Sequence, residues 1–226
     1  MSILKFLGNG SAFNYESFNT AAYIDLGEDL ILIDVGESIC NELIKHHLLE
    51  NRKNVYILIT HTHSDHIGSL EPLLYYNYNF LKTNFQVFYK KRCNLHKLLC
   101  LTGIDFKFKV YPFPKELGGF KLDYVEQKHI PGSYGFFFYG KENFFFSGDT
   151  SIINQRAVEE LKSGKLDYLY HEVSFSGSKI HTQIEKLEET FPKEIRNKVY
   201  LMHFENKEDI EKVKALGFNV GGPKDE

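Results

Sequence analysis

The chain has 226 residues, of which 42% are hydrophobic and 25% charged, a composition typical of a globular protein and not of a disordered or fibrous one. No apolar run approaches the roughly 20 residues that span a bilayer, and the N-terminal MSILKFLGNG does not resemble a secretory signal, so we expect a cytoplasmic protein that does not enter a membrane. The net charge of -3 argues against a large nucleic-acid partner. Three cysteines at no metal-ligand spacing indicate reduced thiols.

Short apolar strands alternate with amphipathic helices along the chain. Strands are expected at SILKFL, TAAYIDL, DLILID and VYILI, and further on at residues 85–89, 106–111, 119–129, 134–139, 143–147, 166–170 and 198–202. Helices are expected at residues 37–49, 155–163, 181–190 and 207–216. This order predicts an α/β (α+β) protein with two sheets packed face to face and helices outside, in one domain over residues 1–226.

The hexapeptide HTHSDH, directly after the strand at residues 55–59, carries His61, His63, Asp65 and His66. His61 and His63 are two positions apart, so their rings point to the same side of extended backbone. Asp65 and His66 follow after the chain turns and face a second position nearby. Imidazole and carboxylate together suit zinc, manganese or iron, and the absence of a cysteine argues against a closed structural zinc site.

Four further loops place a histidine or an aspartate after an apolar strand. Asp34 follows DLILI, His129 follows LDYVEQK, Asp149 follows FFFSG and His203 follows KVYLM. One such residue is usually a turn former or a cap. Five loops of this kind together predict a metal site, provided that the strands lie side by side and their ends converge.

These motifs, together with KHIPGSYGF and SGDT, resemble the metallo-β-lactamase superfamily over nearly the whole chain. The resemblance implies an αββα sandwich with two mixed sheets and two divalent cations at one edge, with Zn²⁺ expected and Mn²⁺ as the alternative. By the family pattern His61, His63 and His129 hold the first cation, Asp65, His66 and His203 hold the second, and Asp149 bridges them. Asp34 is expected to orient the ligands from outside.

Within the superfamily, the chain is most similar to the ribonuclease Z-like branch. YHEVSF contains His171 and Glu172, and KIHTQ contains His181, which resemble two late motifs of that branch. The resemblance makes His181 the candidate general acid, with His171 or Glu172 positioning it, and Asp65 both a ligand and the residue that orients the nucleophile. A hydrogen-bonding pair at a strand end is the structural alternative for His171 and Glu172, and helix capping is the alternative for His181.

The substrate is expected to be small. Only 20 positions separate His129 from Asp149, which leaves no room for the basic arm by which tRNA-trimming relatives hold their substrate. The layout is similar to that of the armless cyclic-nucleotide phosphodiesterases, the anti-Pycsar type, which implies hydrolysis of cyclic nucleotides to nucleoside monophosphates and a homodimer. Tyr75 and Tyr76 are predicted either to cover the site as a lid or to fill the core, and Ser133 is expected to contact substrate. The phenylalanine runs are expected to fill the core.

Three alternatives remain open. The first is a ribonuclease Z-like tRNA 3′-end endonuclease without its arm. The second is a binding protein that sequesters a nucleotide, which the complete ligand set disfavours. Thioester or lactam hydrolysis is the third, and it leaves His181 and the His171–Glu172 pair without a role.

Overall fold

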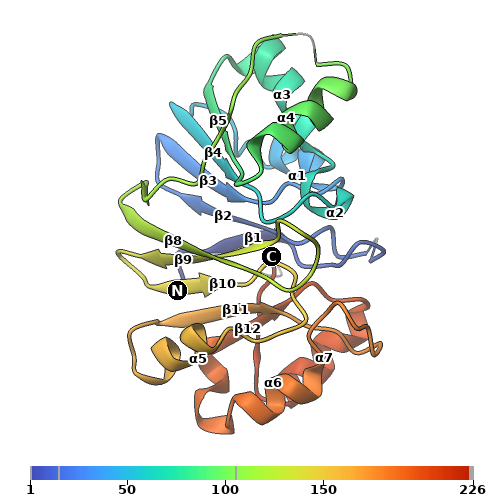
Figure 1. Cartoon of the computed structure of the whole chain (residues 1–226), viewed down its shortest axis with the longest axis vertical. Coiled ribbons are helices and arrows are strands. Elements are labelled where there is room, and N and C mark those ends of the chain that lie inside the picture. The colour runs from blue at the N-terminus through green and yellow to red at the C-terminus, as the bar shows by residue number, and fades with distance from the viewer. Residues whose placement is uncertain (1, 15, 105, 224–226) are drawn as a thin grey trace.

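The computed structural model describes residues 2–14, 16–104 and 106–223, and in this part of the chain two sheets pack face to face (Figure 1). The first sheet has six strands in the order β1-β2-β3-β4-β5-β6 and the second has seven in the order β13-β12-β11-β10-β9-β8-β7. The first comprises β1 (Lys5–Gly8), β2 (Ala21–Asp25), β3 (Asp29–Ile33), β4 (Asn54–Leu58), β5 (Asn84–Phe88) and β6 (Val110–Tyr111). The second comprises β7 (Glu116–Leu117), β8 (Phe120–Glu126), β9 (Tyr134–Tyr139), β10 (Phe144–Phe146), β11 (Tyr168–Glu172), β12 (Val199–Met202) and β13 (Asn219–Val220).

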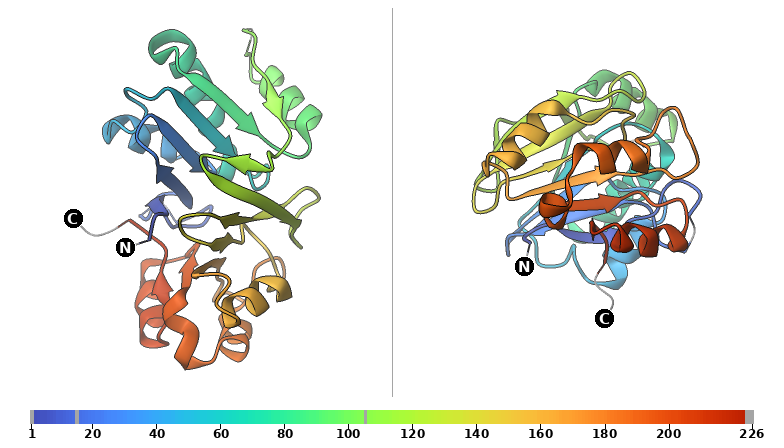
Figure 2. Two further views of the ribbon diagram at one scale, coloured as in Figure 1. Left: turned by 90° about the vertical axis from the view of Figure 1, so that its left-hand side faces the viewer. Right: turned by 90° about the horizontal axis from the view of Figure 1, so that it is seen from below.

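Helices cover the outer face of each sheet, which completes four layers (Figures 1 and 2). On the first sheet lie α1 (Ile39–Lys45), α3 (Leu70–Tyr76) and α4 (Arg92–Leu101), while the short α2 (Ser64–Ile67) follows the HTH segment. The second sheet carries α5 (Gln155–Lys162), α6 (Ile184–Thr190) and α7 (Lys207–Ala215). A π-helical turn, η1 (Asn77–Leu81), continues α3, and a 3₁₀ helix, η2 (Lys193–Lys198), leads into β12. The predicted two-sheet arrangement with helices outside is confirmed.

Among the described residues, no helix is both long enough and apolar enough to cross a membrane.

The phenylalanine runs of β9 and β10 fill two different cores. Phe136 and Phe138 are buried between the two sheets, whereas Phe137, one position along, is buried against the outer helices α5, α6 and α7. Phe145 of β10 faces the same helices as Phe137. Successive side chains of a strand point to opposite faces, so a continuous apolar run is what a sheet covered on both faces requires. The rings are core residues, as predicted, but Phe137 and Phe145 pack against the outer helices and not between the two sheets, where all of the runs were expected.

Some element boundaries differ from the predicted ones. The helix predicted at residues 37–49 spans only Ile39–Lys45, since the chain turns through a left-handed residue at His47. The strand predicted at residues 106–111 shortens to β6, because only its last two residues reach β5. The helix predicted from residue 181 begins at Ile184. Residues 181–183 stay outside it because the Ser174 amide donates to the Thr182 carbonyl and holds this segment beside the end of β11.

The direction of the central strands brings four loops to one edge of the molecule. β3, β4 and β5 run parallel to one another, and so do β10, β11 and β12. The carboxyl ends of parallel strands share one edge of a sheet, and loops on a rigid scaffold are where proteins place functional side chains. Asp34, the HTHSDH segment, Asp149 and His203 all follow such strand ends.

Candidate metal centre and catalytic site

Two groups of histidine and aspartate side chains lie at this edge. His61, His63, His129 and Asp149 form the first group, and Asp65, His66, Asp149 and His203 form the second. Within each group the candidate ligand atoms all lie within 4.8 Å of one another. The structure thus brings together all seven side chains predicted as ligands, with Asp149 common to both groups.

In the first group, one nitrogen of His61 and one of His129 both lie close to a nitrogen of His63. His61 Nε2 and His129 Nε2 each lie 3.1 Å from His63 Nδ1. The opposite nitrogen of His129 donates to the Ile180 carbonyl at 3.1 Å, and that of His61 lies 3.1 Å from Thr60 Oγ1. With their Nδ1 atoms engaged as donors, His61 and His129 both present lone pairs to His63. One proton on His63 cannot satisfy both, whereas a cation between the three nitrogens can.

In the second group the buried His66 Nε2 makes no hydrogen bond within the described part of the chain. It lies 3.3 Å from Asp65 Oδ2 and 3.4 Å from Asp149 Oδ2. His203 Nε2 lies 3.3 Å from the same oxygen of Asp65 and 3.5 Å from that of Asp149. A buried, unsatisfied nitrogen among carboxylate oxygens is the arrangement expected of a metal ligand.

Asp149 is placed to bridge the two groups. Its Oδ2 atom lies 3.8 Å from His61 Nε2 and 3.6 Å from His129 Nε2 in the first group, besides its two contacts in the second. A single carboxylate that faces four imidazoles from two groups suits a pair of cations that share one ligand.

Asp34 lies behind the ligands and fixes their orientation. Its carboxylate accepts hydrogen bonds from the Thr60 amide and hydroxyl, each at 2.7 Å, and from His66 Nδ1 at 2.8 Å. The His66 tautomer is therefore set with Nε2 free for a metal, a support typical of metal-binding histidines. Asp34 and His203 both have left-handed backbone, with φ of 61° and 67°, a conformation that is uncommon for non-glycine residues but that Asp and His adopt more readily than most.

Close backbone packing holds the two loops of the first sheet together. A Cβ atom on Gly36 would overlap the carbonyl oxygen of Asp65, so only glycine fits there. The Val35 amide also donates to the His66 carbonyl at 2.8 Å. The sequence DVG after β3 thus lets the Asp34 loop lie directly against the ligand loop.

The electrostatics of the site favour neutral histidines and charged aspartates in most positions. Burial lowers the pKa of His61, His63 and His129, which keeps these rings neutral as ligands must be. Burial also tends to raise the pKa of Asp149, but the rings of His203 and His66 outweigh it and hold that pKa well below its usual range. Burial opposes protonation of His66, yet Asp149, Asp34 and Asp65 together raise its pKa well above normal. The negative potential of these three carboxylates also attracts a cation.

The donor set therefore fits two divalent cations that share Asp149. His61, His63 and His129 would hold one, and Asp65, His66 and His203 would hold the other. Imidazole and carboxylate ligands without a thiolate are compatible with several first-row divalent metals.

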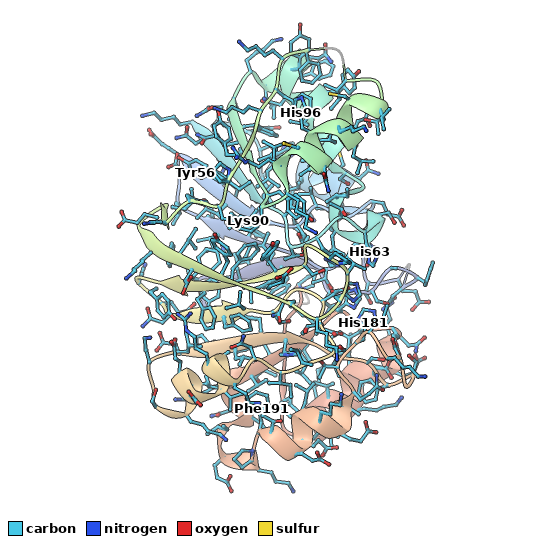
Figure 3. The ribbon with its side chains drawn as sticks, viewed as in Figure 1. Tyr56, His63, Lys90, His96, His181 and Phe191 are labelled. Atoms are coloured by element: carbon cyan, nitrogen blue, oxygen red, sulfur yellow. The ribbon has the colours of Figure 1, made fainter. Side chains whose placement is uncertain are left out.

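His181 and Glu172 lie together beside the two groups. His181 Nδ1 is 3.2 Å from Glu172 Oε2 and 4.0 Å from Asp149 Oδ2. The His181 ring lies 5.1 Å from the His129 ring and 5.2 Å from the His203 ring. Figure 3 shows His63, from the upper half of the molecule, and His181, from the lower half, on the same side. Burial tends to lower the pKa of His181, but the Glu172 carboxylate raises it overall.

The two residues of the predicted His171–Glu172 pair occupy different environments. Glu172 Oε1 accepts hydrogen bonds from the amides of Thr150 at 3.1 Å and Thr182 at 2.9 Å, so its carboxylate ties the Asp149 loop to the His181 loop. His171 is fully buried on the other side of the strand, and its Nδ1 donates to the Glu172 carbonyl at 2.7 Å. The predicted part of His171 in positioning the acid is not supported by these contacts, because alternate residues of a strand face opposite ways.

The structure does not bring Tyr75 and Tyr76, two of the three predicted substrate-binding residues, to the cluster. Tyr75 donates its hydroxyl to the Gly103 carbonyl at 2.8 Å and packs edge-on against Phe106, and Tyr76 packs against Phe80. These contacts lie between α3, η1 and the end of α4, so the alternative of core packing describes both tyrosines better than a lid. Ser133 is buried, and its hydroxyl accepts from the Ile130 amide at 3.3 Å, which stabilises the turn after His129.

Two supporting contacts could not be inferred from the sequence. Thr60 links Asp34 to His61 through its hydroxyl, although a threonine before HTH carries no signal of that role. The Ile180 carbonyl orients His129, and a main-chain acceptor of this kind is independent of side-chain identity.

Solved structures with the same fold cover almost the whole chain. Human tRNase Z, short form (ELAC1), superposes with a TM-score of 0.70 at 17% identity, covering 97% of this chain and 96% of that one. The metallo-β-lactamase fold protein YhfI from Bacillus subtilis gives a TM-score of 0.72 at 16% identity, covering 98% and 96%. These similarities confirm the metallo-β-lactamase fold predicted from the motifs.

Sequence comparison identifies the family. An Apyc1 protein of Paenibacillus sp. (strain J14) is 26% identical over 96% of this chain and 94% of its own length. An Apyc1 protein of Bacillus phage BSP38 is 26% identical over 92% and 91%. The family profile described as "Anti-Pycsar protein Apyc1" matches residues 2–219. The chain therefore belongs to the anti-Pycsar Apyc1 family of metallo-β-lactamase-fold proteins.

Proposed function

We propose that this protein is a metal-dependent phosphodiesterase that opens 3′,5′-cyclic mononucleotides to linear nucleoside monophosphates and thereby counters Pycsar signalling. Membership of the Apyc1 family and the paired histidine and aspartate groups support this proposal. The observation that carries the chemistry is the contact between His181 and Glu172 beside those groups, which supports His181 as the proton donor to the leaving oxygen.

We infer that the two cations are zinc, because five of the seven side chains in the two groups are imidazoles, which suit zinc better than manganese. When bound, two divalent cations neutralise charge on a phosphodiester and lower the pKa of the attacking water. The metal content of the purified protein, measured by mass spectrometry, tests this inference, with manganese as the alternative.

The side chains of the chain supply the remaining steps. Asp65 orients the attacking water by accepting its hydrogen bond, and the proton that the water loses passes to solvent. As the new P–O bond forms, the bond to one sugar oxygen breaks, and His181 gives its Nε2 proton to that oxygen. Glu172 holds Nδ1 of His181, so Nε2 is the nitrogen left to face the substrate. Solvent then returns a proton to His181.

The compact segment between His129 and Asp149 supports a small substrate. Residues 130–148 form one turn followed by β9 and β10, both of which are central strands of the second sheet. All of these residues are described, and none of them forms a separate basic arm for a tRNA. We further propose action as a homodimer in the cytoplasm, which analytical ultracentrifugation tests for the dimer and fractionation of expressing cells tests for the location.

Turnover of a panel of 3′,5′-cyclic mononucleotides tests the proposed activity. The metal-loaded protein is compared with its chelated form, and a pre-tRNA with a 3′ trailer is tested beside it. We expect rapid opening of cyclic nucleotides, loss of activity on chelation, and an intact tRNA. Cleavage of the tRNA alone would overturn the proposal in favour of a tRNA endonuclease.

A further inference from the structure

We propose that Glu205 is a positioning residue that holds the loop carrying His181 in its working conformation. The His181 loop comprises residues 173–183 and joins β11 to α6. Glu205 lies outside this loop, two positions after His203 and before α7. The kinetic consequence of this role rests on the proposed phosphodiesterase activity, whereas the structural consequence does not.

Three donors from the start of the loop converge on the Glu205 carboxylate. Oε1 accepts from the hydroxyls of Ser174 at 2.8 Å and Ser176 at 2.6 Å. The Phe175 amide approaches Oε2 at 3.4 Å. The two serine hydroxyls are themselves 3.2 Å apart, so one carboxylate oxygen gathers both. Hydrogen bonds to an ionised acceptor are shorter and stronger than neutral ones, which makes Glu205 an effective anchor.

The composition of the loop explains why an anchor is needed. The segment SFSGSK is rich in serine and glycine, and Gly177 has φ of 76°, a conformation that costs other residues energy. Such a segment has many accessible conformations in the absence of packing. Gln183 ties the tip of the loop to itself through the Gly177 amide and the Ser178 carbonyl, but these contacts do not attach the loop to the rest of the protein. Glu172 holds the far end of the loop at His181 and Thr182, and Glu205 attaches its beginning.

The His181 loop contributes two groups to the metal centre. It carries His181, and the carbonyl of the preceding Ile180 accepts the Nδ1 proton of His129 at 3.1 Å. A shift of the loop therefore moves the proton donor and releases the orientation of one ligand histidine together. Glu205 lies only two positions after His203. The same short segment therefore carries a member of the second group and, through Glu205, holds the loop whose Ile180 carbonyl contacts His129 of the first group.

A structural experiment tests the anchor without reference to activity. Amide hydrogen exchange of the His181 loop is compared in the wild type and in Glu205→Ala, Glu205→Gln and Glu208→Ala. Glu208 is the matched control, because it is an exposed acid in the same segment that makes no hydrogen bond to the loop among the described residues. We expect faster exchange in Glu205→Ala, intermediate exchange in Glu205→Gln, whose neutral amide oxygen still accepts from both serines but more weakly, and no change in Glu208→Ala. Unchanged exchange in Glu205→Ala would overturn the anchor.

A kinetic experiment tests the consequence for catalysis. Each variant is assayed on a cyclic nucleotide, whose leaving alkoxide needs a proton, and on bis(p-nitrophenyl) phosphate, whose leaving phenolate does not. For Glu205→Ala we expect kcat on the cyclic nucleotide to fall about tenfold or more with a much smaller fall on the aryl ester. Both assays are run at saturating metal, because a shifted Ile180 carbonyl also loosens His129 and weakens metal binding. Equal losses on both substrates would show a merely structural role and overturn the positioning one.

Two further comparisons distinguish failure of the anchor from misfolding of a variant and from failure of the proposed function. Ser176→Ala removes the shortest of the three contacts from an exposed position and serves if Glu205→Ala does not fold. It should reproduce the same selectivity to a smaller degree, and wild-type behaviour on both readouts would count against the anchor. If the wild type opens no cyclic nucleotide although it binds metal, the proposed function fails, and hydrogen exchange alone then decides for or against the anchor.

Discussion

The carboxylate of Glu172 joins three elements of the site. Its Oε2 atom lies 3.2 Å from His181 Nδ1, while Oε1 accepts from the amides of Thr150 and Thr182. One buried side chain at the end of β11 thus connects the loop of the bridging Asp149 with the loop of the candidate acid. We expect that removal of the Glu172 carboxylate or of the His181 ring impairs catalysis while metal binding is retained.

His181→Ala should retain both cations and lose about 10²- to 10⁴-fold in kcat on cyclic nucleotides, the usual contribution of a general acid. The ring lies outside the two groups expected to hold the cations and belongs only to a third cluster with Glu172 and His203, so metal content should match the wild type. Parallel measurement of metal content and turnover checks this expectation. Full activity of the variant on an alkoxide leaving group would exclude His181 as the acid.

Glu172→Gln should also impair turnover, because the amide can present an NH₂ group to His181 Nδ1 where the carboxylate presents an acceptor. The amide oxygen can still accept from the Thr150 and Thr182 amides, so the fold should persist. We expect a loss of about 10²-fold in kcat, close to that of His181→Ala. In the double variant the two losses should not add, since both act on the same proton. Strictly additive losses would contradict the coupling.

Asp34→Asn should weaken metal binding by about 10- to 100-fold, the range found when a residue that orients a ligand is changed. The amide group cannot accept from all three donors that Asp34 now satisfies at Thr60 and His66. Competition with a chromogenic chelator measures the change. Glu50→Gln, on an exposed acid that pairs with His47, is the control and should bind metal as the wild type does.

The stability of the protein should fall in mild acid, in part because of His171. Burial lowers the pKa of this histidine to about 4, below its unfolded value near 6.5. The neutral ring therefore stabilises the fold above about pH 6.5, and this contribution is lost progressively as the pH falls from about 6.5 toward 4. His171→Asn keeps a donor for the Glu172 carbonyl but does not titrate.

Denaturant unfolding of the wild type and His171→Asn checks this prediction at two pH values. Between about pH 7.5 and about pH 5.5 the wild type should lose roughly 1 kcal/mol more than the variant. Because both proteins carry the same ligand histidines, the difference between them isolates residue 171. Parallel losses in the two proteins would show that His171 does not contribute.

The sequence alone determined which histidine and aspartate side chains follow the ends of the apolar strands. Each ligand follows an apolar strand, and the spacing in HTHSDH and the order of the later motifs identified the seven side chains that the structure brings into two groups. The continuous phenylalanine runs also predicted core strands, although only the structure shows that their rings are buried on both faces of the sheet. These features are local, or repeat with a short period, so a linear pattern can reveal them.

Only the tertiary structure decided which neighbours serve the site. His171 and Glu172 are adjacent in the chain, but the pleat of β11 turns Glu172 to His181 and His171 away from it. Tyr75 and Tyr76 follow the ligand loop closely in sequence, yet α3 carries them to the end of α4. Glu205 and the Ile180 carbonyl act through contacts with residues 29 to 51 positions away, which no local pattern encodes. Such partners are set by how two sheets and their loops pack, and that is a property of the folded chain.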